Sequence, residues 1–549
     1  MSYTINPNAK NRWARNAENT MDLSLETDAS SVYLDNGRTL EQEIGEGSMV
    51  SNVATVDSGM EKVIDDTYDG AYESCKMYGK SLVNLMTKEI DTTWNLNLTN
   101  WSIVSTSPSD FILKPNTTYS VIVYVTEKTC SDRDDLFWVG DIDGGKNKIT
   151  HDIVRKNVSL GTNVFVINTV SDFSNLPSTK GGIGFQGSKF VEGTLKWKVI
   201  VLEGDWTDKE LPPYFTGLCD VKAPILKNVG KNILPKETGK WYSCYFKKGT
   251  TFQLTTKDNN PSKGGNIVFV DGSDTKVWMG IDSGVTKKTY TLPNDAHKIS
   301  NQLASGVEYQ LEININATPY EDYKTNILET SNDIVLRGLP NGVKDSYDCL
   351  TGEYVQRIGE VVYNNTNVTG FYVSDSYQKE GCTTFMRPVD ETFKKEPKMI
   401  SNLLPFLPTG HWNDVDECLF AGTVLVIRLK STKASNVTEL QEYLSQHPLV
   451  VQYELAEPIT TTIEPPTTPF AYQNGHIILE SGHEGQSLLP MLEYSTVINK
   501  TGQIENVAKT IQRQEKQLTM LEKMLIQNII NLDYNNTLLT LKNEMEEML

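Results

Sequence analysis

Apolar residues at a stride of seven run through the C-terminal end of this chain. A strict seven-residue stride on a helix makes one narrow apolar edge, which copies of the same chain bury by supercoiling around one another. Polar residues inside such a seam lower stability but specify register and copy number. We therefore predict an α-helical coiled coil over 501–549 that makes the chain self-associate, with a surface helix packed on its own subunit as the alternative. The seam positions are Ile504, Val507, Ile511, Gln514, Leu518, Leu521, Leu525, Asn528, Leu532, Asn535 and Leu539.

The composition before this seam is that of a large globular protein. At 549 residues the chain exceeds what one core supports, and 22% charged with 38% apolar residues argues against disorder. The net charge is −19, and the basic residues are scattered rather than gathered into a stripe. Because nucleic-acid binding requires such a stripe, we expect no nucleic-acid partner.

Export and membrane signals are missing from the sequence. The N-terminal segment lacks the apolar run of a secretory signal, and the longest apolar stretches, at 121–125 and 423–427, are too short to span a bilayer. The seven cysteines are spread singly with no Cys-x-x-Cys pair, which predicts reduced thiols that serve as small core residues. We expect synthesis in the cytoplasm without membrane insertion.

Most of the chain shows the alternation of short strands. In the range 71–220, two segments place apolar side chains on one face, and Gly- and Asn-rich turns separate them. Many short strands without intervening helices predict an antiparallel β-sandwich. The two apolar rows are Tyr119, Val121, Val123 and Val125, and Leu195, Trp197, Val199 and Val201.

A second copy of this module is predicted over 221–325. The apolar positions of the segment 307–315 alternate with polar ones, and two phrases repeat between the modules. Leu113–Tyr119 echoes Phe246–Phe252, and Gly79–Leu82 echoes Gly230–Ile233. A third β-rich domain is predicted over 326–500, with a helix over 436–446 that ends before Pro448. The polar range 1–70 is predicted to be an attachment segment ordered by a partner.

Several longer phrases resemble those of a known class of proteins. They are EGDWTDKELPPYFTGL at 203–218, YEDYK at 320–324, LRGLPNGVKD at 336–345, HPLVVQYELAEP at 447–458 and VYLDNGRTLEQ at 32–42. These phrases resemble tail-fibre and baseplate proteins of phages, and of phage-tail-like bacteriocins, that infect low-GC Gram-positive bacteria. The first four lie within roughly 70–500, and the last resembles the segment by which such fibres join the baseplate.

The resemblance implies a virion structural protein made in the host cytoplasm. It implies a mainly β fold of tandem, jelly-roll-like sandwiches of the carbohydrate-binding kind, and a homotrimer that contacts other baseplate or tail proteins. The implied function is attachment to the host surface by multivalent binding of wall glycans. Two alternatives stay open: an architectural baseplate protein without its own receptor site, and a depolymerase of cell-wall polysaccharide.

Aromatic residues beside acidic turns are the candidate glycan contacts. A flat ring matches the apolar face of a pyranose, and neighbouring carboxylates and amides bond its hydroxyls. Most tryptophans of a sandwich are core residues instead, as the strand phase predicts for Trp197. The candidate ligand-binding residues are Trp138, Asp141, Asp143, Tyr242, Asp271 and Trp278, with Trp101 and Tyr245 as further aromatic candidates.

Metal and catalytic signatures are weak. The segment from Trp138 to Asn147 alternates oxygen-bearing side chains around a Gly turn, as a Ca²⁺ loop does, but it lacks the distal Glu and is more typical of an acidic hairpin turn. The six histidines are dispersed, and neither a Gly-x-Ser-x-Gly nor a His-Glu-x-x-His motif occurs. We expect no metal, no cofactor and no enzymatic activity, although a glycosidase carboxylate pair cannot be read from sequence.

Overall fold

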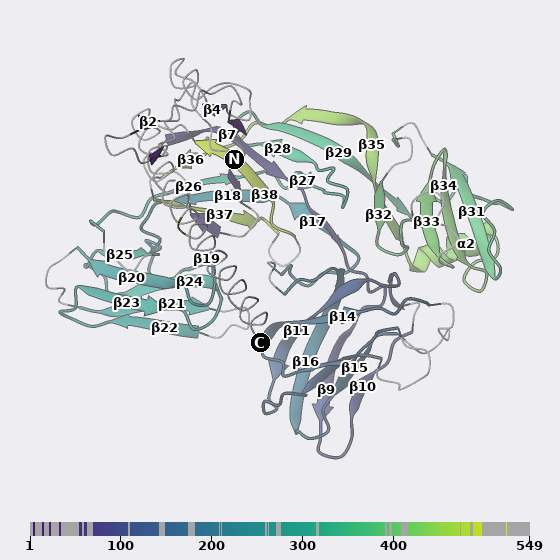
Figure 1. Ribbon diagram of the computed structural model, residues 1–549, viewed down its shortest axis with the longest axis horizontal. Helices are drawn as coiled ribbons and strands as arrows, with labels where there is room; N and C mark the ends of the chain where they lie inside the picture. Colours follow the sequence, from purple (N-terminus) through teal and green to yellow (C-terminus); the bar gives the residue numbers. More distant parts are fainter. Residues whose placement is uncertain are drawn as a thin grey trace, which may run out of the picture. The chain divides into compact units, whose positions relative to one another are not determined.

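In the computed structural model (Figure 1), the chain consists of two units, which are Met1–Asn52 with Thr496–Leu549, and Val53–Ser495. The residues described are 4–5, 14–15, 21–22, 32–33, 54–56, 60–62, 523, and 70–496 without 108–109, 142–148, 174–181, 208, 210, 258–260, 262, 271–275, 314–317, 390–391, 395–397, 408–415, 473 and 484–486. The coiled-coil positions from Ile504 to Leu539 lie outside them. In the first unit, β1 (Thr4–Ile5) pairs with β4 (Val32–Tyr33), and β2 (Ala14–Arg15) pairs with β3 (Met21–Asp22).

The predicted mainly β fold is confirmed, and the strands of the second unit pair antiparallel. Its largest sheet combines strands from distant parts of the sequence in the order β32-β35-β29-β28-β7-β38-β5, with β36 paired to β7. The bounds are β5 Ala54–Val56, β7 Gly70–Tyr78, β28 Ser346–Asp348, β29 Glu353–Tyr363, β32 Met399–Ser401, β35 Leu449–Thr462, β36 Phe470–Ala471 and β38 Met491–Thr496.

Two smaller sheets complete what we call the central frame. Their orders are β26-β18-β37-β6 and β27-β17-β8. The frame therefore takes strands from each of the predicted ranges 71–220, 221–325 and 326–500, and the described sandwiches are insertions between its strands. The bounds are β6 Met60–Lys62, β8 Ser81–Val83, β17 Leu218–Lys222, β18 Pro224–Val229, β26 Thr325–Glu329, β27 Val335–Leu336 and β37 His476–Ser481.

The phrase at 336–345 lies inside this frame and carries its polar network. The carboxylate of Asp345 accepts hydrogen bonds from the backbone N–H groups of Arg337, Arg357 and Ile358, at 3.0, 2.6 and 3.0 Å. The guanidinium Nε of Arg337 lies 3.7 Å from a carboxylate oxygen of Asp220 and 3.5 Å from one of Glu360. The phrase is thus a structural junction between frame strands.

The first insertion, which we call sandwich A, has two four-stranded sheets, β10-β15-β12-β13 and β14-β11-β16-β9. Both predicted apolar rows point into the core between them, and Trp197 is fully buried there. The bounds are β9 Asp91–Leu96, β10 Ser102–Val104, β11 Thr118–Lys128, β12 Phe137–Gly140, β13 Val154–Lys156, β14 Gly161–Asn168, β15 Gly184–Gly187 and β16 Gly193–Glu203.

The second insertion, sandwich B, has the sheets β19-β24-β21-β22 and β23-β20-β25. Taken in chain order, β19 to β25 occupy the same sheet positions as β10 to β16, so the two insertions share one topology. The echo that precedes β11 and β20 fits this equivalence. The bounds are β19 Trp241–Phe246, β20 Thr251–Thr256, β21 Gly265–Val270, β22 Lys276–Ile281, β23 Lys287–Thr291, β24 Ala296–Leu303 and β25 Tyr309–Glu312.

Asn84 and Asn232, at the start of the two insertions, make matching hydrogen bonds and are therefore equivalent. The side-chain oxygen of Asn84 accepts from the backbone N–H of Met86 and of Val201 in β16. That of Asn232 accepts in the same way from Leu234 and from Leu311 in β25. The equivalent phrases are therefore NLMTKE at 84–89 and NILPKE at 232–237, so the predicted echo of 79–82 with 230–233 is wrong.

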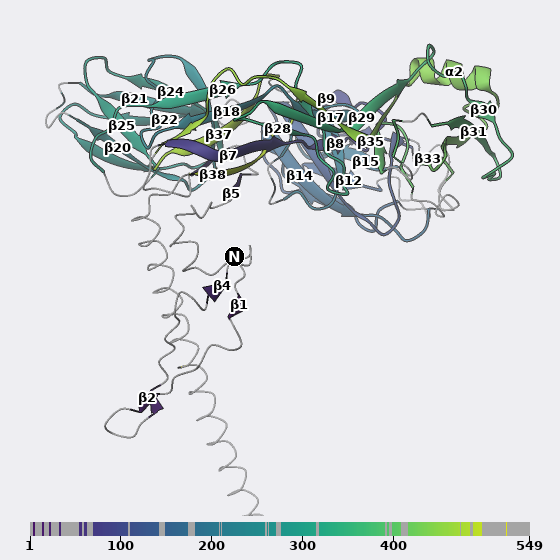
Figure 2. The same cartoon turned by 90° about the horizontal axis from the view of Figure 1, so that it is seen from above.

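A third insertion contains the sheet β30-β31-β34-β33 and the helix α2 (Val437–Gln446). The predicted helix is confirmed: the side chain of Asn436 caps it by accepting from the N–H of Glu439. Leu440 and Leu444 of α2 pack into a core shared with the sheet beside it (Figure 2). The bounds are β30 Tyr372–Val373, β31 Cys382–Pro388, β33 Cys418–Ala421 and β34 Val424–Lys430.

All seven cysteines are buried and free, as predicted for small core residues in reduced form. Burial raises the pKa of the thiols of Cys219 and Cys418 to about 12 and about 11. The thiolate is the reactive form of cysteine, so these two side chains are chemically quiet at neutral pH.

Candidate functional site

The two sheets of sandwich A face different surroundings. From the β14-β11-β16-β9 sheet, Ile122, Ile200 and Leu202 pack into the core of the central frame. The sheet β10-β15-β12-β13 sends Phe137 and Phe185 inward, to the core of the sandwich. Its outward face is the one that sandwich A offers to a ligand.

Four outward positions form a row across this sheet. Ile103 of β10 lies opposite Gln186 of β15, Gln186 lies opposite Trp138 of β12, and Trp138 lies opposite Arg155 of β13. Residues directly opposite each other on paired strands share a face, so the row follows from the register alone. Ile103 is 49% exposed, Trp138 is half-buried and Gln186 is buried.

Two more rings extend this row into an aromatic cluster. The ring of Trp101 lies 5.0 Å from that of Trp138 and 5.7 Å from that of Phe190, between centroids. The indole N–H of Trp138 donates to the carbonyl of Asp135 at 2.7 Å, which fixes the orientation of the ring. Phe190 is 52% exposed. Isolated exposed aromatic residues are ordinary, whereas a contiguous cluster indicates a binding surface.

Three basic side chains lie over these rings. The guanidinium of Arg155 is 3.9 Å from the ring centroid of Trp138, and that of Arg133 is 4.6 Å from that of Phe190. The ammonium of Lys189 lies 5.4 Å from the ring of Trp101. Arg133 is paired with Asp135, but no described carboxylate forms an ion pair with Arg155 or Lys189. We call the set of Trp101, Ile103, Trp138, Phe190, Arg133, Arg155 and Lys189 the ring face.

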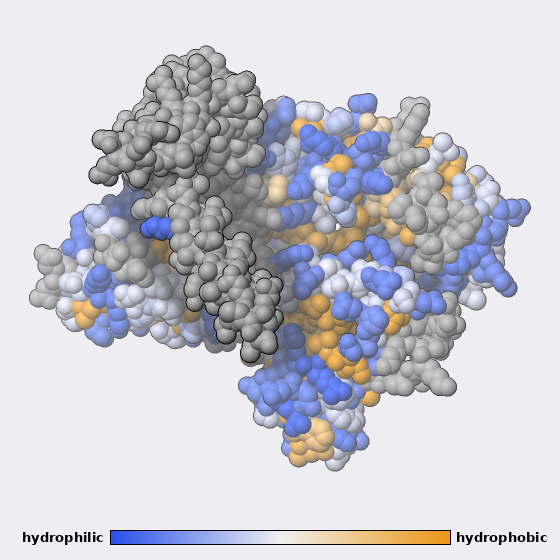
Figure 3. Space-filling view, viewed as in Figure 1, coloured by the Kyte–Doolittle hydropathy of each residue, from blue (hydrophilic) through white to orange (hydrophobic). Residues whose placement is uncertain are grey.

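The ring face combines apolar ring surfaces with cationic side chains whose N–H groups can still donate hydrogen bonds to a ligand. Ring planes suit the apolar faces of sugars, and guanidinium or ammonium groups donate to hydroxyl, carboxylate or phosphate oxygens. A cation that stacks on an indole is held in place without losing its outward N–H groups. The arrangement is thus suited to non-covalent binding rather than to bond cleavage. Figure 3 shows apolar patches, in orange, set among polar residues on the side of sandwich A in view.

The structure brings together some of the candidates named from sequence and separates others. Trp101 and Trp138 meet on the ring face, and Trp278 is 54% exposed on sandwich B. Asp141 is only 5% exposed, and the half-buried Tyr242 packs against the core of sandwich B. Neither of these two belongs to an outward face. Asp143 and Asp271 lie outside the described residues, as does the side chain of Tyr245.

Sequence reasoning missed Phe190, Arg133, Arg155 and Lys189 of the ring face, and Trp241 of sandwich B. Trp241 was recoverable from strand phase. Cys244 and Phe246 of β19 are buried in the core, so Tyr242 shares their inward phase and Trp241 has the outward one. The basic residues gave no signal, because three separate loops and strands supply them.

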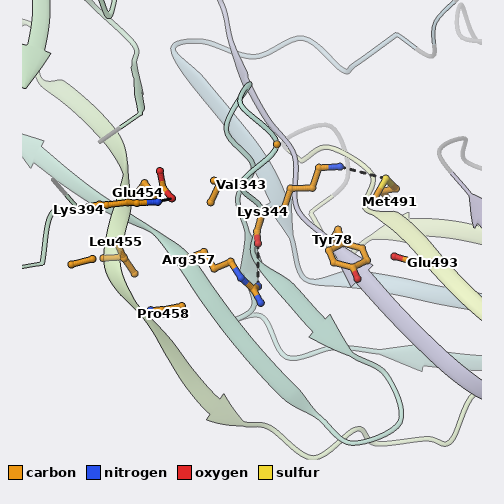
Figure 4. A pocket seen from close by; sticks show the side chains of 12 residues that line it. Tyr78, Val343, Lys344, Arg357, Lys394, Glu454, Leu455, Pro458, Met491 and Glu493 are labelled. Atoms are coloured by element: carbon orange, nitrogen blue, oxygen red, sulfur yellow. Dashed lines mark hydrogen bonds and ion pairs between the residues drawn. The ribbon is translucent and has the colours of Figure 1, made fainter. Parts of the chain in front are cut away.

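An open pocket of about 520 Å³ lies in the frame, between β7, β29, β35 and β38 (Figure 4). Its charged side chains are largely engaged by the protein. Arg357 donates to the carbonyl of Lys344 at 3.2 Å and to the hydroxyl of Ser346 at 3.1 Å. Lys394 forms an ion pair with Glu454. The pocket therefore offers a ligand less than the ring face does.

Known proteins add no assignment. Comparison with protein-family models, with curated proteins and with solved structures finds no match to this chain. Within the described ranges, no group of three or more His, Cys, Asp or Glu side chains is placed to hold a metal ion. In that part of the chain no helix is long and apolar enough to cross a membrane. The ring face is the feature on which a function can be argued.

Proposed function

We propose that this chain is a phage tail-fibre or baseplate protein that attaches the particle to a host surface by binding wall glycan on the ring face. The observation that carries the glycan-binding part is the contiguous, outward cluster of Trp101, Trp138 and Phe190 with basic side chains stacked on it. The virion part rests on the resemblance of the phrases described above.

Weak contacts at each ring face suit this role. Stacking contacts of about 0.5–1.5 kcal/mol for each ring give a single site modest affinity. The proposed C-terminal coiled coil links several copies, so each further contact becomes intramolecular and avidity rises by orders of magnitude. A wall glycan repeats its binding unit and can engage all linked copies.

Two other functions compete with this proposal. An architectural baseplate protein needs no exposed aromatic cluster, so the ring face argues against that function. A depolymerase needs two carboxylates roughly 5–10 Å apart at a bound sugar. On the ring face the acidic side chain identified is Asp135, which is paired with Arg133.

The test measures adsorption of the full-length, fluorescently labelled protein to low-GC Gram-positive cells and to their purified wall polysaccharide. We expect Trp138→Ala to weaken adsorption about tenfold or more, since one stacked ring is worth roughly 1.4 kcal/mol. Tyr372→Ala is the matched control, because Tyr372 is an aromatic residue 46% exposed on β30 of the third insertion.

Three outcomes would contradict the proposal. Intact protein that fails to adsorb to any such cells or polysaccharide favours the architectural role. Equal adsorption by Trp138→Ala and the parent protein removes the ring face from the mechanism. New reducing ends in the polysaccharide after incubation identify a depolymerase instead.

A further inference from the structure

Sandwich B also has an outward row of four residues on the equivalent sheet, and tryptophans stand at both ends of this row. Trp241 of β19 lies opposite Ser300 of β24, which lies opposite Val268 of β21, which lies opposite Trp278 of β22. The two tryptophans are 41% and 54% exposed. They stand on the two edge strands, three strand spacings or about 14 Å apart.

Between these rings lies a polar side chain for which the described residues provide no hydrogen-bond partner. Ser300 and Val268 are fully buried, although the register places both on the outward face. The hydroxyl of Ser300 has no hydrogen-bond partner among the described residues. In sandwich A, the buried Gln186 takes the corresponding place on β15. Both rows thus set a buried polar residue beside exposed apolar or aromatic side chains.

Basic residues accompany the rings on sandwich B as well. In the neighbouring row, Lys298 lies opposite Val270, which lies opposite Lys276. The ammonium of Lys276 is 5.9 Å from the ring centroid of Trp241. We call Trp241, Ser300, Trp278, Lys276 and Lys298 the second ring face.

The charge of these faces is opposite to that of the chain. The whole chain carries −19, yet both ring faces gather lysine or arginine side chains over their aromatic residues. An acidic surface repels a polyanion except where cations are concentrated. Charge complementarity therefore favours an acidic ligand at these two faces.

We propose that the second ring face is a further glycan site and that both faces take an acidic polysaccharide, one whose sugar units carry carboxylate or phosphate groups. The inference rests on the proposed function and narrows its ligand class. It also makes each chain bivalent for one polymer before any self-association.

The experiment uses the full-length protein and wall polysaccharide of low-GC Gram-positive bacteria, separated by anion exchange into a retained acidic fraction and an unretained neutral fraction. We expect binding to the acidic fraction only. Raising NaCl from about 50 to about 500 mM should weaken that binding at least tenfold, since salt screens exposed charges.

Paired variants assign the two sites. The sandwich A variant carries Arg155→Gln and Lys189→Gln, and the sandwich B variant carries Lys276→Gln and Trp278→Ala. Each double variant should weaken binding about tenfold or more, and the variant with all four substitutions should not bind. Lys196→Gln and Lys287→Gln are the matched controls, because they remove exposed charges from the other sheet of each sandwich. Urea denaturation curves that coincide with the parent curve verify folding.

The outcomes separate this inference from the function on which it rests. Salt-independent binding to the neutral fraction overturns the acidic ligand but leaves glycan attachment in place. If the sandwich A variant loses binding and the sandwich B variant binds as tightly as the parent protein, the second site is refuted. Failure of both fractions to bind overturns the proposed function as well. Tighter binding to single-stranded oligonucleotide than to the acidic fraction assigns both faces to nucleic acid and overturns the inference.

Discussion

At the scale of single residues, Asp345 shows what a recognisable phrase does in this fold. Its carboxylate is fully buried and joins three backbone N–H groups that strand pairing leaves free. Burial raises its pKa to about 6, against the lowering effect of those hydrogen bonds and of Arg337. The phrase at 336–345 thus has a structural role in this fold.

We predict that Asp345→Asn destabilises the second unit by about 1–3 kcal/mol, because an amide offers one acceptor oxygen where the carboxylate offers two. Chemical denaturation of the full-length protein measures the change. The exposed Asp375→Asn is the control and should have no measurable effect. Equal stability of Asp345→Asn and the parent protein would refute the structural role of the phrase.

The same side chain predicts a dependence on pH. The folded pKa of about 6 exceeds the ordinary value of 3.8, so the folded state holds this proton more tightly than the unfolded state does. The contribution of Asp345 to stability is complete below the unfolded pKa and is lost as the pH rises through about 6. The difference in unfolding free energy between the parent protein and Asp345→Asn should therefore shrink between about pH 4 and about pH 7. A difference that grows with pH would show that folding lowers the pKa of Asp345 instead of raising it.

At the scale of elements, strand phase was predictable and strand partners were not. Alternation placed the apolar rows of β11 and β16 correctly, and the capped helix α2 followed from Asn436 and Pro448. Alternation does not encode which strand lies beside another. The sequence pattern therefore does not predict that both sandwiches are inserted between frame strands. The rings of the candidate site are visible as residue types, but the prediction from sequence names Tyr242 and not its outward neighbour Trp241.

The equivalence of the two sandwiches predicts matched responses to matched substitutions. Asn84 and Asn232 are buried and each joins the first turn of its insertion to the last strand. We expect Asn84→Ala to destabilise sandwich A by about 1–3 kcal/mol and to speed amide hydrogen exchange there, with no change in sandwich B. Asn232→Ala should do the converse. Exchange that rises in both sandwiches for either variant would show that they do not fold as separate units.

At the scale of the whole molecule, the central frame explains how the insertions can expose the two ring faces without weakening the frame core. Strands from 54–83, 218–229, 325–363, 399–401 and 449–496 pair with one another, so the frame closes only when distant segments meet. Most of each sandwich core lies within the sandwich, although Val229 and Ile478 of the frame join the core of sandwich B, and the ring-face residues belong to none of these clusters. Substitutions on the ring faces are therefore expected to alter binding while the frame stays folded.

Because the cores lie outside the C-terminal seam, deletion of the seam can test whether it makes the chain oligomerise. Removing 501–549 should leave the frame and both sandwiches folded, because their core clusters consist of residues before 497. The truncated chain should run as a monomer in light scattering, and the parent chain as an oligomer, with three copies expected from the resemblance. Truncation should leave the affinity for a short acidic glycan unchanged and lower adsorption to whole cells by about 10²–10⁴-fold, the range that linked sites supply. A parent chain that is monomeric when dilute, or a truncated chain that adsorbs to cells as well as the parent, would show that the seam packs within its own subunit and that avidity has another source.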